Sequence, residues 1–170
     1  MRNEKVKSVA HGGMLAAVAL VIMCLGGLIP LATYICPMLC AIVQFVVLQY
    51  CGRKLAWVWF AVVAVLCLLM GPDKEAAAVF LMLGYYPIVK PVLERSRARW
   101  LWKLLLFNGS VVLLYSLLIH LFGLRDVASD FAVLGIIGLV VMLLLGNAVF
   151  FLLDLLLTML QRKLRGKKSR

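Results

Sequence analysis

The chain has 170 residues, 65% of them hydrophobic, and its 18 Lys and Arg residues far exceed its 7 Asp and Glu residues. This apolar content lies well outside the range of soluble globular proteins, and the length allows one small membrane bundle with no separate soluble domain. The net charge of +11 is confined to short loops and tails, with no aromatic-interleaved basic module, which argues against a nucleic-acid partner. Clusters of this kind favour anionic lipid head groups as partners.

The Lys and Arg residues predict a membrane topology. Sixteen of the eighteen fall into four clusters at every second gap between apolar runs. These clusters are Arg2, Lys5 and Lys7; Arg53 and Lys54; Lys90, Arg95, Arg97, Arg99 and Lys103; and Arg162, Lys163, Arg165, Lys167, Lys168 and Arg170. Lys and Arg are retained on the cytoplasmic side during insertion. We therefore predict an all-α, multi-pass bundle of six transmembrane helices in the cell membrane. It forms a single domain over residues 1–170, with both termini and a basic tail (about 161–170) in the cytosol.

The first predicted span covers residues 12–25. It resembles a secretory signal in being basic and then apolar, but its apolar stretch is longer than a usual signal core, so we expect a retained helix. Residues 28–36, which follow two glycines and include Pro30, are expected to form an outer loop that dips back toward the bundle. Within the span, small residues form two overlapping pairs four positions apart: Gly12, Gly13, Ala16 and Ala17. Such spacing lets helices approach closely, which serves partner docking and internal packing equally well.

The second and third spans, residues 37–51 and 55–70, form a tight hairpin, and an outer turn over residues 71–75 leads to the fourth span, 76–93. Asp73, Lys74 and Glu75 at this turn suit a capped helix start that faces water. With Tyr34 and Tyr115 near the same mouth, they also suit a small polar ligand above an aromatic floor. Aromatic belts place Tyr at membrane interfaces without any ligand, so both interpretations stay open. The five cysteines are expected to pack as small apolar residues.

Polar residues deeper in the bundle predict internal contacts. Tyr85 precedes Tyr86 and Pro87, and this run favours a kinked fourth helix that lines a cavity. Lys90 and Asp154, near the inner boundary, are expected to form a structural or gating ion pair, since isolated charges in a bilayer are costly. Asn108 and Asn147 fall at matching depths on the fifth span, 104–122, and the sixth, which begins at 131. We expect their side-chain amides to form a hydrogen bond between the two helices.

Motifs for catalysis are missing from the sequence. His11 and His120 stand alone, and there is no nucleophile elbow, zinc-binding His-Glu-x-x-His or Walker loop. We therefore expect a protein that is not an enzyme and carries no cofactor or metal.

Taken together, these residues resemble the S component of an energy-coupling factor (ECF) transporter, its substrate-capturing membrane subunit. The resemblance covers nearly the whole chain: its length, its six spans, the small residues of the first helix, the 26–30 loop entry and the 72–75 turn. In that family the first helix carries an Ala-x-x-x-Ala motif that docks on the coupling T component. Gly12 or Gly13 stands at the outer small position here.

The resemblance implies capture of a vitamin or other micronutrient near the outer face, beneath the loop at residues 28–36. ATP hydrolysis would then come from two ATPase subunits bound to the T component. From the residues we place the substrate at Tyr34, Asp73, Lys74, Glu75, Tyr85 and Tyr115. The charges do not choose the ligand, because Lys74 favours an anion and the two acids an amine. The alternative is a small multi-span scaffold resembling the cell-shape protein MreD, with no ligand cavity.

Overall fold

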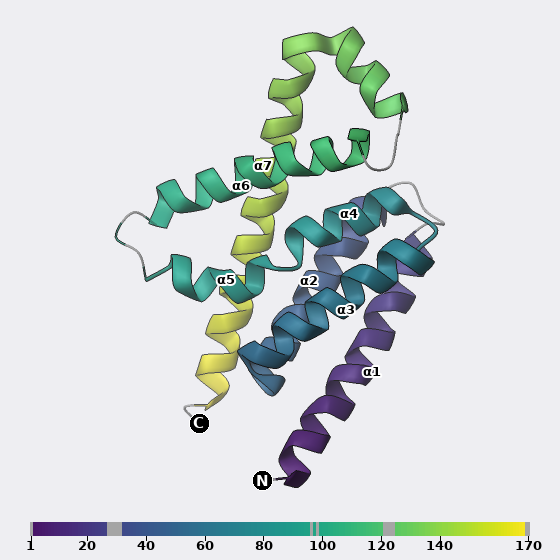
Figure 1. The fold of residues 1–170 in the computed structure, drawn as a ribbon. Helices are drawn as coiled ribbons and strands as arrows, with labels where there is room; N and C mark the ends of the chain where they lie inside the picture. Colours follow the sequence, from purple (N-terminus) through teal and green to yellow (C-terminus); the bar gives the residue numbers. More distant parts are fainter. Residues whose placement is uncertain (1, 27–31, 96, 98, 121–124, 169–170) are drawn as a thin grey trace. The chain divides into compact units, whose positions relative to one another are not determined.

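In a computed structural model that describes residues 2–26, 32–95, 97, 99–120 and 125–168, the chain is helical, and no strand occurs in these ranges. Its helices are α1 (Arg2–Gly26), α2 (Ala32–Cys51), α3 (Arg53–Met70), α4 (Lys74–Leu83), α5 (Tyr86–Leu93), α6 (Arg99–His120) and α7 (Arg125–Lys168) (Figure 1). The predicted all-α class is therefore confirmed. The helices form two compact units, unit 1 (Met1–Arg95) and unit 2 (Ser96–Arg170).

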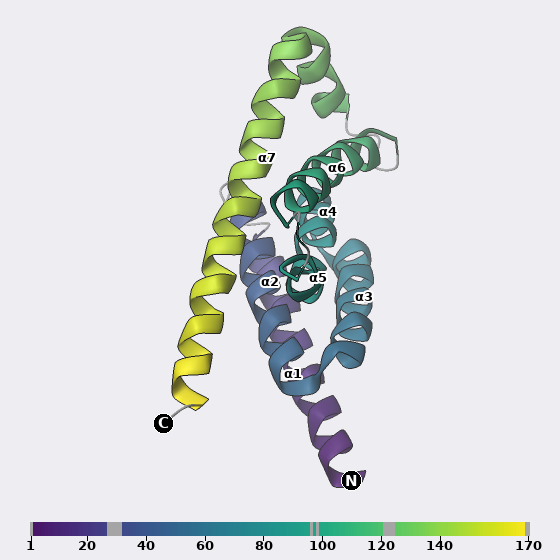
Figure 2. The same ribbon diagram turned by 90° about the vertical axis from the view of Figure 1, so that its left-hand side faces the viewer.

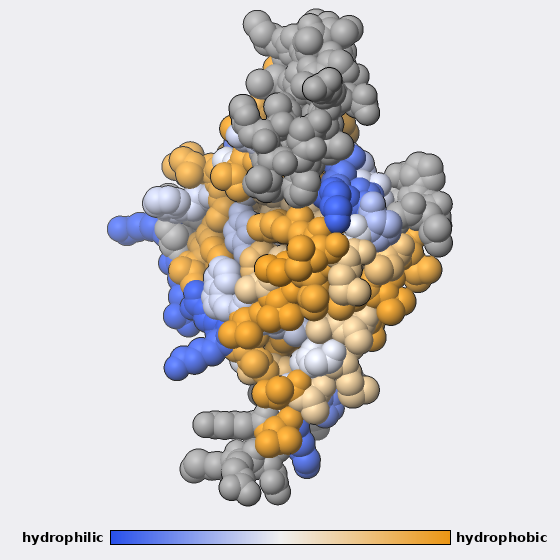
Figure 3. Space-filling model, turned by 45° about the vertical axis from the view of Figure 1, so that its right-hand side comes forward, coloured by the Kyte–Doolittle hydropathy of each residue, from blue (hydrophilic) through white to orange (hydrophobic). Residues whose placement is uncertain are grey.

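Several helices have the length and composition needed to cross a membrane. The qualifying stretches in the described residues are Val6–Gly26, Thr33–Met70, Lys74–Leu93 and Leu143–Lys163, and a shorter apolar helix covers Trp100–Leu114. Thr33–Met70 contains both α2 and α3, which meet at the tight turn around Gly52. Large apolar side chains also remain exposed, including Val21 of α1 and Val62 of α3, and Figure 3 shows a broad apolar face. This make-up is that of a membrane protein.

Unit 1 is built around α2, which packs against α1, α3, α4 and α5. Figure 2 looks almost along α5, which contacts both α2 and α3. The most enclosed helix is α4, where Ala76, Ala77 and Ala78 are completely buried. Their small side chains let neighbouring helices come close, which supplies packing contacts where lipid provides no hydrophobic drive.

Side chains that bond to backbone carbonyl groups fix the alignment of α1 with the α2–α3 hairpin. The indole Nε1 of Trp59 donates to the carbonyl of Gly12 at 2.9 Å, and Cys51 Sγ donates to the carbonyl of Ser8 at 3.3 Å. The hairpin itself turns at Gly52, whose φ of 82° is strained for any residue with a side chain. Ser8 therefore lies at the same end of unit 1 as the hairpin turn.

The fourth predicted span is broken, as its proline suggested. It consists of α4 and α5, which are separated by a turn at Gly84 and Tyr85, and Pro87 stands in the first turn of α5. Proline has no N–H to continue the α4 ladder. Gly84 is also crowded, because a Cβ there would lie 2.8 Å from Cε2 of Phe60. The break is thus set by both the backbone and the packing.

Unit 2 contains α6 and α7, which pack against each other. The rings of Phe107 and Phe150 stack with their centroids 4.4 Å apart. One helical turn further along, Val111 meets Gly146 so closely that a Cβ on the glycine would overlap the valine side chain. Glycine at this position therefore allows the two helices to approach.

Several helices begin earlier than the predicted spans, including α1 at Arg2 and α7 at Arg125. The helix α2 begins at Ala32, so the prediction that residues 32–36 belong to a loop is wrong, while residues 27–31 lie outside the described part. Pro37 is tolerated inside α2 because it lies near the N-terminus and costs a single ladder bond. Likewise α6 begins at Arg99, five residues before the predicted span, since basic residues continue a helix beyond the apolar stretch.

Candidate functional site

The strongest candidate site is the turn between α3 and α4 together with the start of α2. Asp73 caps α4, because its Oδ1 accepts the backbone N–H of Ala76 at 3.1 Å. Its other oxygen, Oδ2, accepts a bond from the hydroxyl of Thr33 at 2.9 Å. Both carboxylate oxygens are therefore used to hold the beginning of α2 against the beginning of α4.

The remaining charged residues of the turn are also hydrogen-bonded. The hydroxyl of Tyr34 donates to Oε1 of Glu75 at 3.0 Å. The ammonium group of Lys74 donates to the carbonyl of Leu68 at 2.6 Å, close to the negative C-terminal end of α3. We call Thr33, Tyr34, Asp73, Lys74 and Glu75 the outer cluster.

The outer cluster brings together four of the residues predicted to bind substrate: Tyr34, Asp73, Lys74 and Glu75. Thr33 and the Leu68 carbonyl were not predicted from the sequence, and no local signal connects Thr33 with an acid forty residues away. Chemically, the cluster offers both signs of charge. A second carboxylate oxygen on Glu75 and further ammonium hydrogens on Lys74 give it hydrogen-bonding capacity beyond the bonds described above.

The two deeper tyrosines are not part of this cluster. Tyr85 follows α4, and ten residues of helix at 1.5 Å each place it about 15 Å from the turn. A ligand that touches both Glu75 and Tyr85 would need a similar length. Tyr115 belongs to α6 in unit 2, and its side chain lies outside the described residues.

The small residues of α1 separate onto two faces. Gly12 is buried and Ala16 packs on the core of unit 1, so these two serve internal packing. Gly13 and Ala17 are exposed, and a Cβ added at Gly13 would meet nothing within 4 Å. The outward pair, Gly13 and Ala17, is therefore the part of the motif open to another helix.

The deeper polar residues each have a partner within their own unit. Lys90 is fully buried, and its ammonium group lies 3.5 Å from Oε1 of Glu94. In unit 2, Lys103 Nζ lies 2.8 Å from Oδ2 of Asp154, a pairing that was not predicted from the sequence. Lys90 and Asp154 belong to different units, and their pairing stays a prediction.

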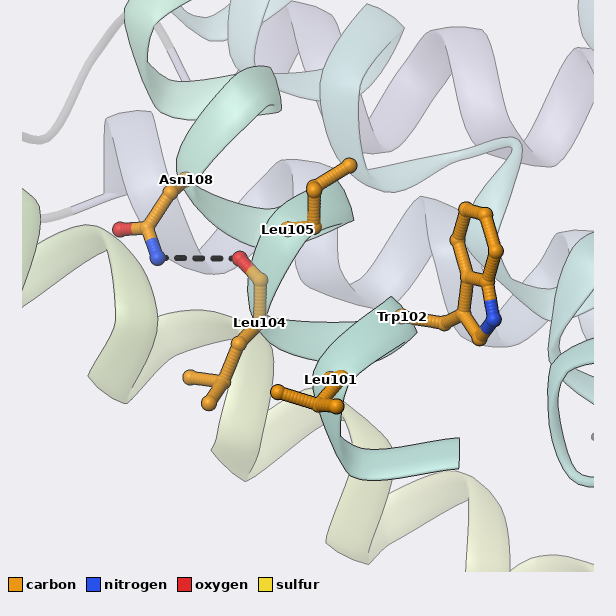
Figure 4. Close-up of a pocket in the computed structure, with 5 residues that line it drawn as sticks. All are labelled: Leu101, Trp102, Leu104, Leu105 and Asn108. Atoms are coloured by element: carbon orange, nitrogen blue, oxygen red, sulfur yellow. Dashed lines mark hydrogen bonds between the residues drawn. The ribbon is translucent and has the colours of Figure 1, made fainter. Parts of the chain in front are cut away.

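The two amides at matching depths are hydrogen-bonded, with Asn147 Nδ2 donating to Asn108 Oδ1 at 2.8 Å. Asn108 also borders an open pocket on α6 (Figure 4). The pocket is otherwise lined by Leu101, Trp102, Leu104 and Leu105. Asn108 turns its amide nitrogen back to the Leu104 carbonyl at 2.9 Å, so it adds little polar character to an apolar surface.

Among the residues that the structure describes, no three His, Cys, Asp or Glu side chains come together in a way that could hold a metal ion. No protein-family model, curated protein or solved structure matches the chain.

Proposed function

We propose that this chain captures a small micronutrient, such as a vitamin, as the S component of an ECF-type importer. In this proposal the substrate enters from the outer face at the outer cluster, with Tyr85 deeper in unit 1, while a role for Tyr115 stays a prediction from the sequence. The T component and two ATPase subunits supply the energy. The observation that carries the proposal is the contact at one end of unit 1 between the start of α2, with Tyr34, and the charged start of α4, with Asp73, Lys74 and Glu75.

The proposed topology has six spans, both ends in the cytosol and a cell-membrane location. Support comes from the distribution of charge in unit 1, where α1, α2, α3 and α4–α5 supply four crossings. Lys7, Arg53 and Lys54 lie at the end that contains the hairpin turn, since Cys51 contacts Ser8 there. The acidic residues Asp73 and Glu75 lie at the other end. This polarity agrees with a cytoplasmic hairpin turn.

The proposed docking surface for the T component is the outward pair of α1. Gly13 and Ala17 are exposed in the described structure, whereas Gly12 and Ala16 pack within unit 1. Adding bulk to the outward pair should block close approach of another helix without disturbing the core.

A pull-down of tagged chain from its own cells tests this proposal. We expect the wild type to retain a T component and ATPase subunits. Gly13→Leu or Ala17→Leu should reduce the retained amount at least about tenfold, which corresponds to a loss of about 1.4 kcal/mol in binding free energy. Val18→Leu is the matched control, because Val18 is exposed on α1 beside this pair. A wild-type chain that retains no coupling subunits would contradict the proposal. Equal retention by all variants would move the docking surface elsewhere.

A scaffold resembling MreD is the second candidate, and one observation favours it. Asp73, Lys74 and Glu75 each already bond within unit 1, so the outer cluster has a structural role without any ligand. Native mass spectrometry separates the candidates: a small metabolite retained by the purified chain supports capture, while a ligand-free chain with a cytoskeletal partner supports the scaffold.

A further inference from the structure

Three exposed cations gather at the hairpin end of unit 1: Lys7 on α1, and Arg53 and Lys54 in the first turn of α3. The contact between Cys51 Sγ and the Ser8 carbonyl places Lys7, the neighbour of Ser8, at the level of the hairpin turn. The bond between Trp59 and the Gly12 carbonyl holds α1 in the same alignment one turn further on. We call Lys7, Arg53 and Lys54 the basic end.

Among the described side chains, no carboxylate forms an ion pair with Lys7, Arg53 or Lys54. The ion pairs found among the described side chains join Lys90 with Glu94 and Lys103 with Asp154. The first turn of α3 contains no acid, and its two cations stand at the positive end of the helix dipole. An anion supplied from outside would therefore be favoured at this position.

The surroundings of the basic end indicate which anion fits. Tyr50, in the last turn of α2, is 75% exposed, and Trp57 of α3 is 40% exposed. Aromatic residues of this kind sit at the head-group level of a bilayer. Beside them Val6 and Val58 are also exposed, so the cations adjoin an apolar surface that acyl chains can cover. An acidic protein segment would neutralise the charge but leave that apolar surface in water.

We propose that Lys7, Arg53 and Lys54 bind the phosphate of an anionic phospholipid, with Tyr50 and Trp57 beside its glycerol region. The site requires that unit 1 crosses a membrane, but it does not require that the chain is an importer. Each cation near an anionic surface contributes a similar, additive attraction, so loss of two of the three should weaken binding strongly.

The test uses the full chain in neutral detergent micelles, titrated with phosphatidylglycerol while thermal unfolding is followed. Phosphatidylglycerol should raise the melting temperature of the wild type, whereas phosphatidylcholine and inorganic phosphate should not. Replacing both cations of α3, Arg53→Gln with Lys54→Gln, should raise the half-saturating lipid concentration by about thirtyfold. The conservative pair Arg53→Lys with Lys54→Arg should keep the wild-type value.

The matched control removes the same charge from α7, where Arg162 and Lys163 are also exposed. This cluster has no aromatic residue beside it in the sequence, so Arg162→Gln with Lys163→Gln should raise the half-saturating concentration by no more than about fivefold. The proposal is wrong if phosphatidylglycerol does not stabilise the wild type, if the Arg53 and Lys54 double variant keeps its response, or if both double variants lose it equally. An equal response to inorganic phosphate would point to a free anion and would also overturn it.

Discussion

The two ends of unit 1 handle charge in opposite ways. At the outer cluster, Asp73, Lys74 and Glu75 each bond to another residue of the same unit. At the basic end, Lys7, Arg53 and Lys54 have no carboxylate partner among the described residues. The charges of the outer cluster connect helices and stabilise the fold. The charges of the basic end change the free energy of unfolding little, and they remain available to an outside partner.

The largest change in the free energy of unfolding is expected from substitution of Asp73. Asp73→Ala removes the cap of α4 and leaves the Thr33 hydroxyl without its acceptor, so we expect the free energy of unfolding to fall by about 2 kcal/mol. Denaturant titration in neutral detergent measures this change. Asp73→Asn is the control. Asparagine also caps helices, so this variant should lose less than half of the free energy of unfolding that the alanine variant loses. A neutral effect of the alanine variant would show that the outer cluster does not hold α2 against α4.

A smaller loss is expected at Lys74. Lys74→Met keeps most of the side-chain length but removes the bond to the Leu68 carbonyl and a cation near the C-terminal end of α3. We expect a loss of about 1 kcal/mol in the same titration. Lys74→Arg preserves the charge and should recover most of that loss. If the methionine variant is as stable as the wild type, the hydrogen bond from Lys74 to the Leu68 carbonyl does not stabilise the fold.

The smallest effect is expected at the basic end. Without anionic lipid, Arg53→Gln and Lys54→Gln should each change the free energy of unfolding by no more than about 0.5 kcal/mol, since both residues are exposed and lack a carboxylate partner. The variants should be slightly more stable than the wild type, because a cation at a helix N-terminus is repelled by the helix dipole. A loss above 1 kcal/mol would mean that these cations have a structural role, and the contrast between the two ends would fail.

Local chemistry in the sequence predicted several parts of this structure. Pro87 indicated the break between α4 and α5, and the Pro72–Glu75 turn indicated a helix start that Asp73 does cap. Clustered Lys and Arg indicated where apolar runs end. Each of these signals depends on residues close together in the chain, where backbone geometry and charge act directly.

Contacts between distant residues were harder to predict. Nothing near Thr33 or Lys103 in the sequence points to Asp73 or Asp154, because such pairs depend on the rotation and register of packed helices. The same reason explains why spacing alone did not separate Gly12 from Gly13. Adjacent residues on a helix point about 100° apart, and only packing decides which one faces inward.

The bond between Trp59 and Gly12 has a spectroscopic consequence. Trp59 is 5% exposed, whereas Trp57, Trp100 and Trp102 are each at least 40% exposed. Its indole N–H is bonded to a carbonyl of α1, so its emission reports on the contact between α1 and α3. In a chain whose other three tryptophans are phenylalanine, a red shift in fluorescence would reveal that α1 has moved away from α3. The protein thus contains an intrinsic optical sensor on the inner side of the helix whose outward side carries Gly13 and Ala17.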